Sequence, residues 1–293
     1  MKKLTSLLFV LGCAPSLLAQ QRPAITGIAQ VRLYATSPAA SDAFYAKVLG
    51  LEQTKSGNSD VYFVNDLQSI ALSPLPAPAP PTRMEAVVFR TRDAAALQKV
   101  MTDHAIKIVQ PLAHGTFAVH DPEGNLILFT ETQTHPTGAS SQATSPRIIH
   151  AGLVVKDRDA EDRFYRDLLG FHLYWQGGSK DGQLDYVAMQ VPDGTDWLEY
   201  MLNVPANANA HQLGGADHLS LGVTHMSDAV AALQRNGCQG ENCAKTQMGR
   251  DGKVQLNLFD PDLTRVEYME YSPSGTTCCS PIVGKTPKDK EDR

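Results

Sequence analysis

The sequence predicts an α+β fold made of four copies of one βαβββ module, paired into two domains. One observation behind this is an internal offset, because adding 68 residues carries His150 onto His218 and Glu199 onto Glu267. The other is a likeness between the two halves of the chain, in which two short motifs each occur twice. Repetition at fixed offsets is typical of duplicated structural units and is better evidence for architecture than any single predicted strand.

The repeated motifs mark equivalent points of the two halves. Phe-Tyr-Ala-Lys-Val-Leu-Gly-Leu at 44–51 parallels Phe-Tyr-Arg-Asp-Leu-Leu-Gly-Phe at 164–171. Asp-Pro opens two further matching segments, 121–131 and 260–270. In the first of these, Asp-Pro-Glu-Gly is strong turn chemistry and predicts a hairpin.

The first predicted domain, residues 25–132, starts with an alternating segment that indicates a strand at 25–35. Ser37 and Pro38 suit the start of a helix and Gly50 suits its left-handed end, so a helix is expected between them. The other elements expected are a polyproline-like connector at 73–81, a helix at 93–104, and strands at 52–55, 61–64, 69–73, 84–90, 106–110, 116–120 and 125–131.

A polar linker, 133–146, leads to the second predicted domain, 147–272. A second linker at 203–215, rich in Asn, Ala and Gly, separates its modules, and the Pro/Gly/Ser/Lys-rich tail 273–293 is expected to be disordered. The elements expected are helices at 159–169 and 227–236, and strands at 148–155, 171–176, 184–191, 196–202, 217–223, 244–248, 253–259 and 264–270.

Composition limits the range of partners. The 293 residues are 42% hydrophobic and 19% charged, with a formal net charge of −5. These are ordinary values for a globular protein. There is no Lys/Arg run or basic stripe, so nothing in the composition indicates a nucleic-acid or anionic-membrane partner.

The first 19 residues resemble a signal peptide, with Lys2 and Lys3 before an apolar core and Ala19 at the expected cleavage point. We therefore expect an exported protein, periplasmic or secreted. Val-Leu-Gly-Cys at 10–13 also loosely resembles a lipoprotein box, which leaves a lipid anchor at Cys13 as an alternative. The apolar run is too short for a confident membrane span, and no later stretch is long enough.

Four cysteines remain after such a leader. Cys238 and Cys243 are close together in a loop-like segment and could form a disulfide in an oxidising compartment. Cys278 and Cys279 are adjacent in the tail, where a disulfide or an inert pair is a safer interpretation than a soft-metal site.

Two imidazoles and two carboxylates at equivalent repeat positions form a nitrogen and oxygen set suited to a divalent transition metal. A lone His or Glu in a strand is more often structural, but four in register favour a metal site. The neighbours of each are apolar, and a carboxylate pointing inward there would be costly without a compensating cation. The predicted metal ligands are His150, Glu199, His218 and Glu267.

At these residues and repeats the sequence resembles the vicinal oxygen chelate superfamily, which includes glyoxalase I, extradiol dioxygenases, methylmalonyl-CoA epimerase and bleomycin-resistance proteins. The resemblance covers about 25–272. It implies that each domain is a cupped mixed sheet with helices outside, and that ligands come from the first and last strand of each module. It leaves open whether modules pair within one chain or between the subunits of a homodimer.

The two-His, two-Glu set is similar to that of glyoxalase I. This implies a lyase or isomerase in which the metal polarises a carbonyl and a carboxylate moves a proton, with Glu267 as first choice of base and Glu199 as second. Ni, Zn, Co, Mn or Fe would each accept such ligands. Export argues against a glutathione-dependent reaction, so another small oxygenated substrate is expected.

An extradiol ring-cleaving dioxygenase is the alternative enzyme class, with Fe(II) held by His150, His218 and Glu267. Two departures from that family's signature count against it. Asn257 stands where those enzymes carry a Tyr, and 248–250 is Met-Gly-Arg where they carry a His. Glu199 would also add a fourth protein ligand at the expense of oxygen.

The third alternative is a non-catalytic binding protein of the bleomycin-resistance type, which suits the first domain. Its positions matching the predicted ligands are Gln30, Ala71, Met84 or Glu85, and Leu128, so a structural role without metal is expected there. His114 and His120 are interpreted as surface or turn residues. In the second domain, strand alternation indicates that Gln255, Asn257 and Arg265 line the pocket.

Overall fold

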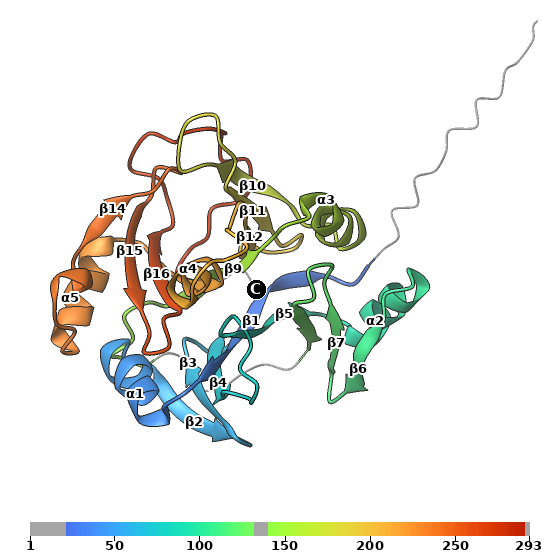
Figure 1. Ribbon diagram of the computed structural model, residues 1–293, viewed down its shortest axis with the longest axis horizontal. Helices are drawn as coiled ribbons and strands as arrows, with labels where there is room; N and C mark the ends of the chain where they lie inside the picture. The colour runs from blue at the N-terminus through green and yellow to red at the C-terminus, as the bar shows by residue number, and fades with distance from the viewer. Residues whose placement is uncertain (1–21, 132–139, 291–293) are drawn as a thin grey trace, which may run out of the picture.

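The computed structural model describes residues 22–131 and 140–290, so the predicted leader and the first half of the predicted interdomain linker lie outside the described residues. Each half of the chain forms one eight-stranded mixed sheet. Figure 1 shows the first domain, coloured blue to green, beside the second, coloured yellow-green to red. The predicted α+β fold of tandem paired modules is confirmed.

The first domain contains eight strands and three helical segments. In chain order they are β1 (Ile25–Ala35), α1 (Pro38–Asp42), η1 (Ala43–Val48), β2 (Glu52–Ser56), β3 (Ser59–Phe63), β4 (Ser69–Pro74), β5 (Met84–Thr91), α2 (Ala94–Asp103), β6 (Ile108–Ala113), β7 (Thr116–His120) and β8 (Leu126–Thr130).

The second domain repeats this order with two additional short helices. Its elements are β9 (Arg147–Val154), α3 (Arg158–Glu161), η2 (Asp162–Leu168), β10 (His172–Gly177), β11 (Tyr186–Gln190), β12 (Trp197–Met201), α4 (Ala210–Ala216), β13 (His218–Val223), α5 (Met226–Arg235), η3 (Glu241–Cys243), β14 (Thr246–Met248), β15 (Val254–Phe259) and β16 (Arg265–Glu270). Helix α4 lies in the segment expected to be a linker, where Asn209 and Gln212 form a capping box.

The strand order explains how distant residues come together. In the second sheet the order is β10-β11-β12-β9-β13-β16-β15-β14, and the first sheet has the equivalent order β2-β3-β4-β1-β5-β8-β7-β6. The two modules of a domain meet where their first strands pair antiparallel, and each last strand lies parallel beside its own first strand. The first and last strands of both modules are therefore the four central strands of each sheet.

Helix ends follow the chemistry that the sequence predicts. The Ser37 hydroxyl accepts a hydrogen bond from the Ala40 amide, and Pro38 occupies the first helical position. Gly50 and Gly170 end the equivalent helices with φ of 69° and 77°. A side chain at Gly50 would also be blocked, because a Cβ there would lie 2.0 Å from the carbonyl oxygen of Gln142.

The repeated motifs hold the two domains together by reciprocal contacts. The hydroxyl of Tyr165, from the second-domain Phe-Tyr motif, donates to Asp121 of the first-domain Asp-Pro turn at 3.1 Å. The hydroxyl of Tyr45, from the first-domain motif, donates to Asp260 of the second-domain turn at 2.8 Å. Each domain therefore inserts its turn against the helix of the other.

A second reciprocal contact joins the central strands of the two sheets. The side-chain amide of Gln68, just before β4, donates to the Ile148 carbonyl and accepts from the Ile148 amide, both at 2.8 Å. The Asp196 carboxylate, just before β12, accepts from the Ile28 amide at 2.8 Å. All four groups are buried, so these bonds satisfy polar atoms that would otherwise be costly.

Residues 273–290 of the tail make contacts with the second domain, although their composition predicts disorder. The Ser280 hydroxyl bonds the backbone of Gln176, the Val283 amide donates to the Tyr174 carbonyl, and the Lys285 amide donates to Gln190. These contacts continue the edge of the second sheet beyond β10, and they give the tail backbone partners that its composition does not reveal. Among the described residues, no helix has the length and apolar character needed to cross a bilayer.

Glu161 is buried near the contact between the two domains, and it generates a prediction about how the stability of the fold depends on pH. Burial, followed by the nearby Asp121 charge, raises the pKa of Glu161 from 4.5 to about 9. Because the folded-state pKa is the higher one, the carboxyl stabilises the fold fully below its unfolded pKa, and this stabilisation is lost as pH rises through about 9. We expect the melting temperature of the wild type to fall between about pH 5 and about pH 9, and Glu161→Gln to flatten that profile by at least about 2–4 °C.

Asp159→Asn, an exposed change on the same helix, is the control and should keep the wild-type profile. Calorimetry across the pH range makes the measurement. A Glu161→Gln profile as steep as that of the wild type would contradict the prediction.

Candidate metal centre

The four predicted ligands converge on the central strands of the second sheet. His150 lies on β9, Glu199 on β12, His218 on β13 and Glu267 on β16. Both imidazoles are fully buried, Glu267 is 2% exposed and Glu199 is partly exposed. The structure therefore brings together all four side chains that the repeat identified.

The ring nitrogens and carboxylate oxygens point at one another. The Nε2 atoms of His150 and His218 are 3.0 Å apart. His150 Nε2 is 3.1 Å from Oε2 of Glu267 and 3.7 Å from Oε2 of Glu199. His218 Nε2 is 3.5 Å from Oε2 of Glu199 and 3.8 Å from Oε2 of Glu267.

This spacing fits a bound transition metal. Donor atoms about 2.0–2.2 Å from an ion lie roughly 3 Å apart at a right angle and roughly 3.5 Å apart at a tetrahedral angle. One donor of each of His150, Glu199 and His218 also lies within 4.8 Å of the others. Oε2 of Glu267 is buried and, apart from the 3.1 Å approach of His150 Nε2, has no hydrogen-bond partner among the described residues, as expected for an atom that needs a cation.

The residues around His218 fix its tautomer and keep it neutral, so that its Nε2 atom can act as a metal ligand. Its Nδ1 lies 2.7 Å from the Ala216 carbonyl oxygen, which can only accept, so the ring proton is on Nδ1. Burial, with the positive charge of Arg265 and the neighbouring His150, lowers the pKa of His218 well below its usual value. The ring therefore stays neutral and offers the Nε2 lone pair, toward which Arg265 donates at 2.8 Å.

A glycine makes room for this imidazole. Gly152 on β9 pairs in register with His218 on β13. A Cβ built on Gly152 would lie 2.1 Å from Cε1 of His218, closer than any side chain could approach. The absence of a side chain at this position therefore allows the His218 ring to lie across β9 toward His150.

The two carboxylates have different environments. Burial raises the pKa of Glu199, partly offset by His150. Burial also acts to raise the pKa of Glu267, but Arg265 and the two imidazoles outweigh it and hold that pKa at about 2. Glu267 is the more buried carboxylate, with a side-chain exposure of 3% against 12% for Glu199.

Sequence reasoning missed a stack of side chains that supports His150. The Trp197 ring lies 4.8 Å from the His150 ring, and the Tyr174 ring stacks on Trp197 at 4.9 Å. The buried Lys253 ammonium donates to the Tyr174 hydroxyl at 2.9 Å and lies within 4.8 Å of both ring centroids. Burial lowers the pKa of Lys253 to about 8, opposed by Asp251. A lone lysine before a strand gives no sequence signal for this role, because lysine is ordinarily exposed.

A pocket of about 610 Å³ opens onto the two carboxylates. Gln255 and Arg265 line it, as strand alternation predicts. Asn257, which is also predicted to line the pocket, is not among the lining residues, although it pairs in register with Glu267. The pocket is also lined by Trp175, Tyr186, Met201, Met248 and Arg250.

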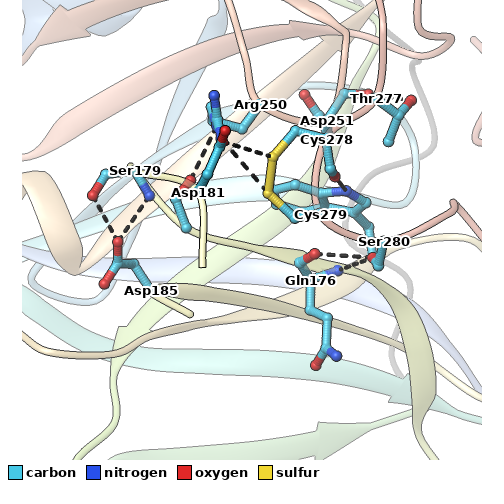
Figure 2. The surroundings of a disulfide bond; sticks show 12 residues. Gln176, Ser179, Asp181, Asp185, Arg250, Asp251, Thr277, Cys278, Cys279 and Ser280 are labelled. Atoms are coloured by element: carbon cyan, nitrogen blue, oxygen red, sulfur yellow. Dashed lines mark hydrogen bonds and ion pairs between the residues drawn. A yellow bond between two sulfur atoms is a disulfide. The ribbon is translucent and has the colours of Figure 1, made fainter. Parts of the chain in front are cut away.

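The vicinal disulfide lies beside this pocket. Cys278 bonds to Cys279, and the predicted Cys238–Cys243 loop also forms a disulfide. Figure 2 shows the Arg250–Asp181 ion pair lying against the two sulfur atoms of the vicinal pair. The indole of Trp175 donates to the Cys278 carbonyl at 3.2 Å, so the tail supports one wall of the pocket.

The register of the first sheet corrects one predicted equivalence. Arg32, on β1, pairs with Ala71 and with Ala86, as Gly152 pairs with Glu199 and His218 in the second sheet. Ala86 is thus the counterpart of His218, and the prediction of Met84 or Glu85 is wrong. A β-bulge between Arg32 and Leu33 adds one residue to β5 and displaces the count.

Comparison with known proteins identifies the family. Residues 27–129 and 147–268 match the Glyoxalase/Bleomycin resistance protein/Dioxygenase superfamily, and each match falls on one of the two sheets. The chain therefore belongs to this superfamily, as the sequence resemblance implies. No curated protein sequence matches the chain closely enough to count as a relative.

Solved structures share the fold at low sequence identity. The substrate complex of homoprotocatechuate 2,3-dioxygenase from Brevibacterium fuscum has a TM-score of 0.64 and 19% identity, with 85% of this chain and 81% of that chain covered. The Mn(II)-bound glyoxalase from Novosphingobium aromaticivorans has a TM-score of 0.63 and 16% identity, with 85% and 83% covered. At these identities the likeness shows the fold alone.

The tight packing at Gly152 predicts the effect of one methyl group. Gly152→Ala should displace the His218 ring and weaken Mn(II) binding by about 10–100-fold, the usual cost of disturbing the groups that orient a metal ligand. Gly215→Ala is the control, because Gly215 also lines the pocket while a Cβ there meets nothing within 4 Å. Titration calorimetry of the metal-stripped proteins measures both affinities. Equal losses in the two variants would contradict the prediction.

Proposed function

We propose that the second domain holds one divalent transition-metal ion through His150, Glu199, His218 and Glu267. The observation that carries this proposal is the convergence of two buried Nε2 atoms and two carboxylate oxygens within 3.0–3.8 Å. When bound, the metal would supply Lewis-acid polarisation of a substrate carbonyl or hydroxyl oxygen. Mn, Fe, Co, Ni and Zn all suit these donors.

We propose that the domain is a lyase or isomerase that moves a proton next to that oxygen. The sequence alone places Glu267 first as the base. The geometry favours Glu199 instead, because its side chain is the more accessible to the pocket and no described Lys or Arg forms an ion pair with it. Arg265 lies 4.0 Å from Oε1 of Glu267 and stabilises that carboxylate as a fixed ligand.

The substrate class follows from the pocket wall. Arg265 reaches the metal site from β16 with a side chain 17% exposed, and its fork of donors suits a carboxylate or enolate oxygen. Arg250 lies further out and is already paired with Asp181. Trp175, Tyr186, Met201 and Met248 offer apolar contact. An oxygen-rich small acid fits this combination.

Metal analysis tests the site. The purified wild type, loaded with Mn(II) and desalted, should contain about one equivalent by mass spectrometry, and His218→Ala should contain almost none. Glu199→Gln should keep most of the metal yet lose about 10²–10⁴-fold in turnover of a responsive substrate, since it removes the proton acceptor. A wild type that stays free of metal would overturn the proposal and leave a binding protein.

Two assays separate the enzyme classes. Fe(II)-loaded protein with 3,4-dihydroxyphenylacetate tests ring cleavage, which we do not expect, because Asn257 faces Glu267 where the dioxygenase signature has a Tyr. Exchange of the hydrogen next to the carbonyl of 2-hydroxy and 2-oxo acids, followed in deuterium oxide, tests proton transfer. Ring cleavage without exchange would favour the dioxygenase alternative.

We also propose that the chain is exported. The support is the sequence of its first 19 residues, with two lysines before an apolar core. Mass spectrometry of the protein recovered from the producing cells should find a mature amino terminus after Ala19. A diacylated amino terminus at Cys13 would establish the lipoprotein alternative, and an intact Met1 would contradict export.

A further inference from the structure

We propose that the first domain is a second, metal-independent binding site for a small organic carboxylate with an apolar body. The site is the cup of the first sheet, at the position that the metal centre occupies in the second sheet. In it an arginine, Arg32, replaces the metal as the cationic group that holds an anionic oxygen. This proposal is independent of the chemistry of the second domain.

The register of the sheet places Arg32 at the centre of the cup. Its counterpart in the second domain is Gly152, the glycine beside the metal site. The positions of the other ligands carry small or apolar side chains: Ala71 for Glu199, Ala86 for His218 and Leu128 for Glu267. The space taken by ligands in one sheet is thus available to the arginine in the other.

A short hydrogen-bond relay orients the guanidinium. Nε of Arg32 donates to Oε1 of Gln30 at 2.7 Å, and Nε2 of Gln30 donates to the Ser69 hydroxyl at 2.9 Å. Gln30 is the counterpart of His150, so this relay begins at the position of a metal ligand. The relay uses only the Nε donor of Arg32. Its two terminal amino groups form no hydrogen bond or ion pair with a described residue, which leaves both ends of the fork available for a carboxylate.

The charge balance of the cup favours an anion. No described carboxylate forms an ion pair with Arg32, and none of the described residues that line the cup is acidic. Lys55 stands on the rim and pairs with Asp60, which lies outside the lining. Guanidinium is always charged at neutral pH and costs free energy when half-buried without a counter-ion. A carboxylate ligand would remove that cost.

The floor of the cup determines the rest of the ligand. The cavity has a volume of about 470 Å³, within the range that holds a small molecule. Its floor is formed by buried Ala29, Val61, Phe63 and Val88. The nearby Ala71, Ala86 and Ala118 have small side chains and therefore leave space above the sheet. An aromatic or alicyclic ring could lie on these side chains while its carboxylate reaches Arg32.

Benzoate and its neutral analogue benzamide are the probes. Titration of the metal-stripped full chain, followed by saturation-transfer NMR, should show saturable benzoate binding and at least about tenfold weaker benzamide binding. Arg32→Met should weaken benzoate at least about tenfold and leave benzamide unchanged, while Arg32→Lys should retain part of the affinity. Arg265→Met, which removes an arginine charge from the second-domain pocket, should leave benzoate affinity unchanged.

A second variant distinguishes loss of the binding site from misfolding of the protein. Ala86→Leu fills the cup and keeps Arg32, and it should also weaken benzoate while melting near the wild-type temperature. Wild-type affinity in Arg32→Met would overturn the proposal, as would loss of binding in Arg265→Met. The absence of saturable binding to the wild type up to about 10 mM benzoate would overturn it as well, because even a weak specific site has a millimolar dissociation constant.

Discussion

The strand register at the centre of each sheet is the constraint on which the structure depends. Pairing of β9 with β13, and of each with its own last strand, aligns four positions on one concave surface. In the second domain these positions carry ligands. In the first domain they carry a glutamine, two alanines and a leucine. The same backbone therefore makes a metal centre or an anion-binding cup according to a few side chains.

Much of this could be predicted from the sequence because duplication repeats information. The equal spacing of His150–Glu199 and His218–Glu267 identified four side chains that the fold brings together, and no single strand prediction could have done so. The equivalence of Ala86 could not be predicted, because a bulge in β5 is invisible to residue counting. Lys253 was missed since its burial depends on two aromatic rings from β10 and β12, which are far away in the sequence.

The structure adds contacts that composition does not reveal in the segment 203–215 and in the tail. Asn, Gly, Ser and Pro are typical of loops, and composition cannot show whether a loop finds tertiary partners. In α4 the Asn209–Gln212 capping box offsets a glycine-rich helix. In the tail, the Ser280 hydroxyl bonds the backbone of Gln176 and the Val283 amide donates to the Tyr174 carbonyl. Local propensity was overridden by contacts made in the folded protein.

The reciprocal Tyr–Asp contacts between the domains have an evolutionary consequence. Each half carries both complementary parts, so a gene encoding only the second half would present Tyr165 and Asp260 to another copy of itself. A symmetric dimer could thus have preceded the fused chain. After fusion, one half no longer needs the metal ligands, while both halves retain the Tyr–Asp contacts that join them. The ligand positions of the first domain could then diverge while its turn and helix kept the contacts with the second domain.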